Sequence, residues 1–329
     1  MSKYSIGIDL GGTKILTALV NKDNGEIISS IKKKTKKDKG PDKIVHKIVK
    51  SIKEVLIEGK KEITDIEDIG IGVAGQIDRN KGIVINAPNL DCANLNLKEI
   101  LEQEFNKKVL IGNDVEIATI GEMYFGAGKD KKDFVCIFVG TGIGSGIVQN
   151  GKIRYGATGT AGEIGHIIVD IGGRPCGCGG CGCLEAYASR LAIEKRIIGA
   201  LKKGRKSDIQ NYLTDDKPIK TSMIRKSLEN KDELVTQIIN EASEYLASGL
   251  ASVINFYNPE MIILGGGLMN AVDYFYDKAT QIAKIKSLPT PSCNIKFAKA
   301  QLGDFSGVIG AALLSEYRHS KIYNTENDR

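Results

Sequence analysis

The sequence predicts an α/β protein built from two domains. Short apolar runs with the length of strands alternate with longer segments that have the apolar spacing of helices. Glycine-rich turns follow several of the predicted strands. The chain has 329 residues, of which 42% are hydrophobic, so it is long enough to bury a sizeable core in each of two domains.

The N-terminal third alternates strands with helices. A helix is predicted for residues 41–57, because apolar side chains recur on one face of that segment. A second helix is predicted for about residues 115–125. The apolar runs that predict strands are residues 4–10, 14–20, 68–74 and 108–113.

The rest of the chain repeats this alternation. Residues 134–151 contain no charged side chain, but their glycines and polar residues favour two buried strands around a turn over a membrane span. One long helix is predicted for residues 231–258, ending before a proline, then a strand and glycine turn over 260–267 and a closing helix over 306–318.

Two glycine turns have the same form, which indicates a weak internal duplication. "DLGGTK" starts at Asp9 and "GTGIGSG" starts at Gly140, and each joins two apolar strands. A third turn, "LGGGL", lies between a strand and a helix. Turns with so little side chain let backbone N–H groups approach phosphates. The segment "GIGVAG" matches the G-x-G-x-x-G motif of dinucleotide-binding sites. That motif must be followed by a helix, whereas a hairpin is predicted here, so we do not expect a dinucleotide site.

Charge and composition argue against nucleic-acid and membrane partners. The net charge of +6 comes largely from residues 32–39, "KKKTKKDK", which we interpret as a solvated turn after a strand. There is no DNA-reading motif, and the 6% aromatic content offers no stacking platform for single strands. The N-terminus lacks the apolar core of a signal peptide, so we expect a cytoplasmic protein.

Four of the seven cysteines fall within eight residues, in "CGCGGCGC" from residue 176 to residue 183. In a chain without a secretion signal, this spacing favours a zinc site over disulfides. Thiolates suit zinc, and glycines allow the tight turns that closely spaced ligands need. Either all four cysteines or three of them with His166 could be the ligands, and spacing alone does not decide.

Several motifs together identify a family. "IGIDLGGTK", "APNL", "IGNDVEIATIGE", "FVGTGIGSGIV", "GEIGHIIVD", "CGCGGCGCLE" and "IILGGG" occur in this order. From about residue 4 to residue 317 the chain resembles the ROK family of sugar kinases and repressors. This resemblance implies the two-domain actin-like ATPase (ribonuclease H-like) fold with an interdomain cleft. We expect one domain from residues 1–113 plus about 305–329, and the other from 114–304.

The resemblance also implies roles for individual residues. A structural zinc ion would be held by His166, Cys176, Cys178 and Cys183, with Cys181 as a bystander. Asp114 would be the general base, and Asp9 would hold Mg²⁺. The sugar would contact Asn89, Asn113, Asp114, Glu163, His166 and Glu185. The nucleotide would lie against Asp9, Gly11, Gly12, Thr13, Lys14, Thr141, Gly142, Gly265, Gly266 and Gly267.

These roles imply an ATP-dependent hexose kinase that phosphorylates a sugar hydroxyl, foremost the 6-hydroxyl of glucose. Fructose, mannose, N-acetylmannosamine and N-acetylglucosamine are alternative acceptors, and polyphosphate or ADP are alternative donors. The members that are transcriptional repressors carry a helix-turn-helix before the first glycine turn, for which Asp9 leaves no room. The presence of Asp114 argues against a non-catalytic sugar sensor. A sensor or a repressor is the alternative from a different class of function. A homodimer or higher homo-oligomer is expected. Ala74 and Ser145 depart from the family pattern.

Overall fold

The computed structural model describes residues 3–35, 40–213 and 218–319. Contacts within the chain divide it into two compact units. The first consists of Met1–Asp130, Gly151–Ile153 and Asp304–Arg329, and the second of Lys131–Asn150 and Arg154–Gly303.

Helix α3 (Asp114–Phe125) groups with the first unit, whereas the sequence led us to expect a domain boundary before residue 114. The reason is its close packing on helix α11 (Ser306–Ala312). A Cβ atom at Gly121 would lie 2.4 Å from the carbonyl oxygen of Ser306, and one at Gly310 would lie 1.7 Å from that of Ile117. Only glycine allows the two backbones to approach this closely.

The first unit is built on a five-stranded sheet with the order β3-β2-β1-β4-β8. The strands β1, β2 and β3 pair antiparallel, and β1, β4 and β8 run parallel. Their bounds are Tyr4–Leu10 (β1), Lys14–Asn21 (β2), Glu26–Lys34 (β3), Ile66–Val73 (β4) and Lys108–Asn113 (β8). Residues 32–34 of the basic run thus belong to a strand and not to a turn, and residues 36–39 lie outside the described ranges.

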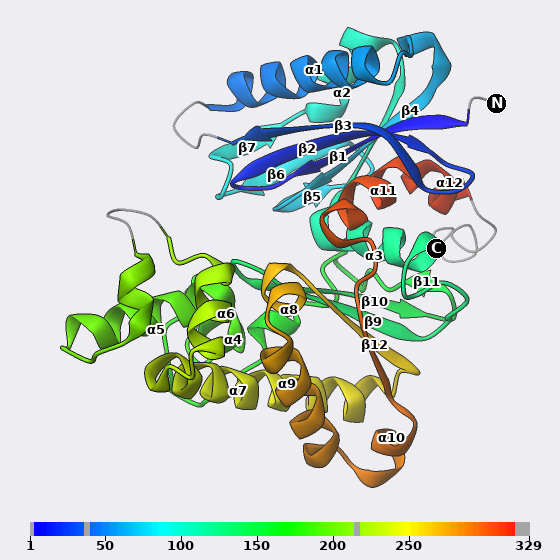
Figure 1. Ribbon diagram of the computed structural model, residues 1–329. Coiled ribbons are helices and arrows are strands. Elements are labelled where there is room, and N and C mark those ends of the chain that lie inside the picture. Colours follow the sequence, from blue (N-terminus) through cyan, green and yellow to red (C-terminus); the bar gives the residue numbers. More distant parts are fainter. Residues whose placement is uncertain (1–2, 36–39, 214–217, 320–329) are drawn as a thin grey trace. The chain divides into compact units, whose positions relative to one another are not determined.

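Helices cover both faces of this sheet (Figure 1). Helix α1 (Gly40–Glu58) packs on β2 and β3, and α11 packs on β1, β4 and β2. Glycine again sets the distance, since a Cβ at Gly7 or Gly70 would lie 1.8 Å from a carbonyl oxygen of α11. The predicted closing helix is divided at Leu313 into α11 and α12 (Leu314–His319), and an unpredicted helix α2 spans Leu97–Phe105.

A smaller three-stranded sheet also belongs to the first unit. Its order is β5-β6-β7, with β5 at Gln76–Asp78, β6 at Ile83–Ala87 and β7 at Cys92–Leu95. The antiparallel pair β5 and β6 is the predicted hairpin that follows "GIGVAG". The turn between β6 and β7 carries Asn89.

The second unit repeats part of the strand order of the first. Its strands have the order β10-β9-β12-β13, like β2-β1-β4-β8; β10 pairs antiparallel with β9, and β12 runs parallel to β9 and β13. The bounds are Phe134–Val139 (β9), Ile143–Gln149 (β10), Met261–Gly265 (β12) and Lys296–Lys299 (β13), and the short strand β11 (Lys152–Ile153) is grouped with the first unit. The two strands predicted within residues 134–151 are confirmed. A hairpin around a glycine turn, β1–β2 or β9–β10, occurs in both sheets.

Helices form most of the remainder of the second unit. The predicted long helix is confirmed as α7 (Glu233–Tyr257), which packs along α9 (Asp273–Lys286) and shares one apolar core with β9 and β12. The others are α4 (Glu185–Ala188), α5 (Arg190–Lys202), α6 (Thr221–Glu229), α8 (Gly267–Ala271) and α10 (Pro289–Asn294). Within the described ranges, every helix is too short or too polar to cross a bilayer.

Candidate functional site

The first glycine turn, residues 11–13, joins the carboxyl end of β1 to β2. The N–H of Gly11 donates to the Lys14 carbonyl at 3.0 Å. Thr35, just after β3, fixes the turn from the other side: its hydroxyl donates to the Gly11 carbonyl and its N–H to the Thr13 carbonyl, both at 3.0 Å. The turn is therefore held in one shape by the neighbouring strand.

Two charged side chains flank this turn. Burial raises the pKa of Asp9 above its usual value, although the nearby Lys14 acts in the opposite direction. A carboxylate in this environment would gain from a bound cation. The ammonium of Lys14 lies 3.2 Å from the carboxylate of Asp304, which also accepts from Lys32 at 3.2 Å. Any contact of Lys14 with a phosphate would compete with this ion pair.

The turn between β6 and β7 and the carboxyl ends of β4 and β8 lie at the same edge of the first unit. A Cβ atom at Gly12 would lie 2.7 Å from the Cβ of Asn89, so the turn between β6 and β7 touches the first glycine turn. Asn89 itself is exposed. Parallel pairing sets Leu10, Val73 and Asn113 side by side at the carboxyl ends of β1, β4 and β8. Asn113 is therefore about 10 Å, or two strand spacings, from the end of β1.

Asn113 and Asp114 occupy the junction of β8 and α3. Asn113 caps the helix: its side-chain oxygen accepts from the N–H of Val115 at 2.9 Å and of Glu116 at 3.3 Å, and the Glu116 carboxylate accepts from the Asn113 N–H at 3.3 Å. This reciprocal pattern is a capping box. Asp114, the first helical residue, is half-buried, and its Oδ1 accepts from the Val115 N–H at 3.0 Å.

Arg79 and Glu116 were not predicted from the sequence as site residues, although both lie at this junction. The Nε and Nη2 atoms of Arg79 each lie 2.8 Å from Oε2 of Glu116. The side chains are 19% and 5% exposed. The Asn-x-x-Glu spacing of Asn113 and Glu116 would have indicated the capping box, but nothing local marks Arg79 as its partner.

In the second unit, the glycine turn between β9 and β10 is closed by the N–H of Gly140, which donates to the Gly142 carbonyl at 2.9 Å. The N–H of Arg190 donates to the Gly140 carbonyl, also at 2.9 Å. Thr141 stands exposed at the tip of this turn. The turn is thus anchored to the start of α5 while its tip is accessible.

The third glycine turn packs against the second. Gly265 ends β12, and Gly266 precedes α8 with φ at +95°. A Cβ at Gly266 would lie 2.4 Å from the carbonyl oxygen of Val139, the last residue of β9. Since β9 and β12 are parallel neighbours, Thr141, Gly142 and Gly267 lie near one edge of the sheet. A ligand with phosphates could meet backbone N–H groups from both turns.

Glu163 and His166 lie in a loop that packs directly on β10. His166 ends a single 3₁₀ turn over Ile164–His166, and a Cβ at Gly165 would lie 2.1 Å from the Ile143 carbonyl oxygen. The hydroxyl of Ser145 donates to the Gly162 carbonyl. Ser145, a departure from the family pattern, therefore lies in β10 and holds the start of the loop that carries Glu163 and His166.

His166, Cys176, Cys178 and Cys183 converge, with their ligand atoms all within 4.8 Å of one another. The Sγ atoms of Cys178 and Cys183 are 3.7 Å apart, and Sγ of Cys176 is 3.7 Å from Nδ1 of His166. Two sulfurs bound to one tetrahedral zinc ion are about 3.8 Å apart, so the set has the dimensions of a zinc site. Cys181 is exposed and outside this group.

The thiols of this group differ in acidity. Hydrogen bonds from the Gly180 backbone and from the other two thiols lower the pKa of Cys178 to about 7, whereas burial raises that of Cys183 to about 12. Burial also raises the pKa of Cys176. Because zinc binds thiolates, loading the site releases protons mainly from Cys176 and Cys183.

Glu185 connects the cysteine group to the second glycine turn. Its Oε1 lies 3.7 Å from Sγ of Cys176, and its Oε2 accepts from the Ile143 N–H at 3.0 Å. A Cβ at Gly142 would lie 2.1 Å from Oε2, so glycine leaves room for this carboxylate. The loop around the cysteines thus delivers Glu163, His166 and Glu185 beside β10.

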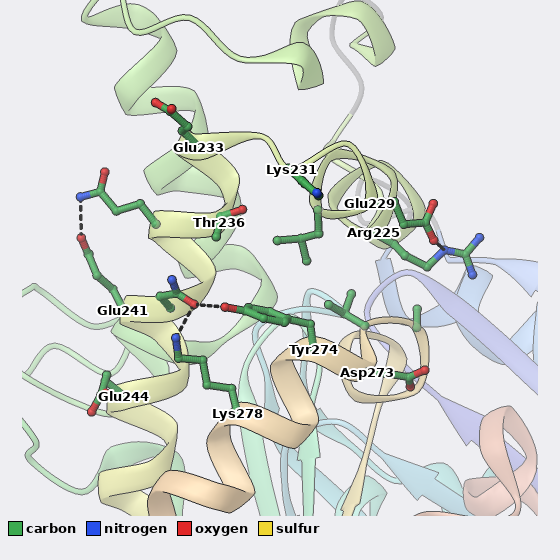
Figure 2. Close-up of a pocket in the computed structure, with 15 residues that line it drawn as sticks. Arg225, Glu229, Lys231, Glu233, Thr236, Glu241, Glu244, Asp273, Tyr274 and Lys278 are labelled. Atoms are coloured by element: carbon green, nitrogen blue, oxygen red, sulfur yellow. Dashed lines mark hydrogen bonds and ion pairs between the residues drawn. The ribbon is translucent and has the colours of Figure 1, made fainter.

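Figure 2 shows a separate pocket of about 1020 Å³ between α6, α7 and the junction of α8 and α9. Tyr274 and Lys278 point from α9 toward α7 and donate to the side-chain oxygen of Asn240 at 2.6 and 2.7 Å. Its walls carry charges of both signs, and none of the residues predicted from the sequence lines it. The functional assignment therefore rests on the glycine turns, the cysteine group and the start of α3.

Comparisons with known proteins agree with these features. The family model described as "ROK family" matches residues 5–318. The glucokinase of Halalkalibacterium halodurans is 32% identical, with 97% of each chain covered. A crystal structure of a ROK family glucokinase from Streptomyces griseus, in complex with glucose and AMPPNP, is 32% identical with a TM-score of 0.83, covering 94% of this chain and 98% of that one. The xylose repressor of Caldicellulosiruptor bescii is 32% identical over 93% of this chain and 76% of the repressor.

Proposed function

Because the chain belongs to the ROK family and has its actin-like ATPase fold, we propose that it is an ATP-dependent glucose kinase. It transfers the γ-phosphoryl group of ATP to the 6-hydroxyl of glucose. The observation that carries this proposal is the half-buried carboxylate of Asp114 beside Asn113, at the strand edge that also carries Asp9 and the first glycine turn. The similarity to glucokinases supports glucose as the acceptor.

The carboxylate of Asp114 activates the acceptor. A hydroxyl is a weak nucleophile, and a positioned carboxylate accepts its proton as the oxygen attacks phosphorus. The sugar contacts that we propose are Asn89, Asn113, Glu163, His166 and Glu185. Since Nδ1 of His166 faces the thiols, its Nε2 is the nitrogen that meets a sugar hydroxyl.

The donor is held by the glycine turns. The phosphate contacts that we propose are residues 11–13, Lys14, Thr141 and Gly142, and residues 265–267 are proposed to lie near the nucleoside. Asp9 would hold Mg²⁺, which supplies charge neutralisation to the phosphates when bound. Phosphoryl transfer depends on positioning and charge stabilisation, which preformed backbone turns can provide.

Zinc would be held by His166, Cys176, Cys178 and Cys183 and would act structurally. The donor set of one imidazole and three thiols is closed, as in structural zinc sites. Its contribution is to fix the loop that carries the sugar ligands Glu163, His166 and Glu185.

A panel assay tests the proposed function. ADP release would be measured with ATP and Mg²⁺ against glucose, fructose, mannose, N-acetylmannosamine and N-acetylglucosamine. We expect glucose to give the highest kcat/KM. A higher value for another sugar would keep the kinase and reassign its acceptor, which is set by pocket shape. Inactivity across the panel, with folded and zinc-loaded protein, would favour a different donor or the non-catalytic sugar sensor.

Substitution of Gly266 tests the nucleotide side. Gly266→Ala adds a Cβ that would lie 2.4 Å from the Val139 carbonyl, at a residue with φ of +95°. Because the change displaces the turns next to the phosphates, we expect the KM for ATP to rise about tenfold or more, with a smaller change in the KM for glucose. Gly199→Ala, whose Cβ would contact nothing within 4 Å, is the control. An unchanged KM for ATP in folded Gly266→Ala would contradict the placement.

We also propose a homodimer or higher homo-oligomer. Phe256 and Ile285, at the ends of α7 and α9, are 81% and 76% exposed. Leu288 is 60% exposed, and its N–H donates to the side chain of Asn255, the residue before Phe256. Exposed apolar side chains that lie together are typical of protein–protein contacts. Light scattering coupled to size-exclusion chromatography measures the mass directly, and a monomeric mass at micromolar concentration would contradict the proposal.

A further inference from the structure

The N-terminus of α3 is held in place by Arg79, the residue that follows strand β5 of the three-stranded sheet. Arg79 follows β5 and places two guanidinium nitrogens 2.8 Å from Oε2 of Glu116. The same oxygen accepts from the N–H of Asn113 at 3.3 Å. The Glu116 side chain is only 5% exposed, so the guanidinium compensates a charge that water hardly reaches.

A second contact from the same segment reaches the same junction. The side-chain amide of Asn113 donates to the carbonyl of Gly75 at 3.4 Å, four residues before Arg79. Residues 75–79 therefore hold both the side chain of Asn113 and, through Glu116, its backbone. Each contact bears on the residue next to Asp114.

The segment also belongs to the sheet that carries Asn89. Arg79 follows β5, β5 pairs with β6, and the turn after β6 presents Asn89. The ion pair is thus a direct link, within the first unit, between the sheet of Asn89 and the helix of Asp114. Without Arg79, the nearly buried carboxylate of Glu116 would lose the guanidinium that compensates its charge, and the capping box that it forms with Asn113 would be weakened.

We propose that Arg79 is a positioning residue for the acceptor site: through Glu116 it fixes Asn113 and Asp114 relative to Asn89. This inference rests on the proposed kinase function. The geometry of the general base, Asp114, then depends on the ion pair between Arg79 and Glu116, although neither of these two residues touches the sugar. A guanidinium suits this task, because its fixed fork donates twice to one carboxylate, whereas an ammonium is a flexible point charge.

The experiment compares Arg79→Met, Arg79→Ala, Arg79→Lys and Glu116→Gln with the wild-type protein. We expect Arg79→Met to lower kcat on the order of ten- to a hundredfold and to raise the KM for glucose, because a small displacement of reacting groups has an effect of this size. The KM for ATP should stay within about twofold of wild type, since no nucleotide contact depends on Arg79. The kcat of Arg79→Lys should lie between that of the wild-type protein and that of Arg79→Met. Free guanidinium added to Arg79→Ala should partly restore its kcat.

Glu67→Gln is the matched control. Glu67 pairs with the buried Lys22 at 2.6 Å near the amino end of β4, at the opposite edge of the same sheet from Asn113. We expect it to lower the melting temperature while kcat remains normal. All variants are assayed well below their melting temperatures, so that a loss of folded protein is not read as a loss of turnover.

Two results would overturn the inference. One is a kcat and glucose KM within about twofold of wild type for both Arg79→Met and Glu116→Gln. The other is a loss of activity that follows the melting temperature in the same way for Arg79→Met and Glu67→Gln, which would make the pair purely structural. An inactive wild-type protein would refute the proposed function instead, so the two failures are distinguishable.

Discussion

Asp114→Asn is expected to lower kcat by about two to four powers of ten while glucose and ATP still bind. Asparagine keeps the shape of the side chain and its oxygen, which can still accept from the Val115 N–H. It cannot take up the proton of the attacking hydroxyl. Steady-state kinetics and calorimetric titration with glucose would separate turnover from binding.

Asp42→Asn is the matched control for this substitution. Asp42 is an exposed acidic residue in the first turn of α1, in the same unit. It removes the same charge from the same kind of position, where the helix dipole contributes about 0.3–1 kcal/mol. Near-normal turnover in Asp114→Asn would contradict its assignment as the general base.

Cys178→Ser is expected to abolish zinc binding and to weaken glucose binding by at least about tenfold. The physical reason is that the cysteine group fixes the loop on which Glu163, His166 and Glu185 depend. Elemental analysis gives the zinc content per chain, and calorimetry gives the dissociation constant for glucose. The melting temperature should also fall, because binding of a structural metal stabilises the folded state.

Cys181→Ser is the control in the same loop. Cys181 is exposed and lies outside the convergent group, so zinc and glucose binding should both be retained. Loss of zinc from Cys181→Ser would show that four cysteines hold the metal. A zinc-free Cys178→Ser protein with unchanged glucose affinity would contradict the role of the metal in fixing the sugar loop.

Features encoded over short stretches could be predicted from the sequence. The hairpins around "GGT" and "GTG" were predictable because glycine turns and apolar runs specify them locally, and the structure confirms both. The same holds for the long helix α7 and for the strand β8. The choice between His166 and a fourth cysteine was not local, since Nδ1 of His166 approaches the thiols only after the loop folds back ten residues later.

Features that depend on distant segments could not be predicted in this way. Helix α3 groups with the first unit because glycines let it pack on α11, which lies almost 200 residues later. Arg79 and Glu116 are 37 residues apart, and no spacing rule connects them. A capping box marks one end of that interaction, but its partner becomes visible only in three dimensions.

The proposed reaction is transfer of a phosphoryl group from ATP to the 6-hydroxyl of glucose, with Asp114 as the base. The most direct test measures glucose 6-phosphate formed from ATP, Mg²⁺ and glucose by the zinc-loaded wild-type protein and by Asp114→Asn. We expect one glucose 6-phosphate for each ADP with the wild-type protein, and at most about one hundredth of that rate with the variant. No glucose 6-phosphate from folded wild-type protein, or equal rates from both proteins, would contradict the proposed reaction.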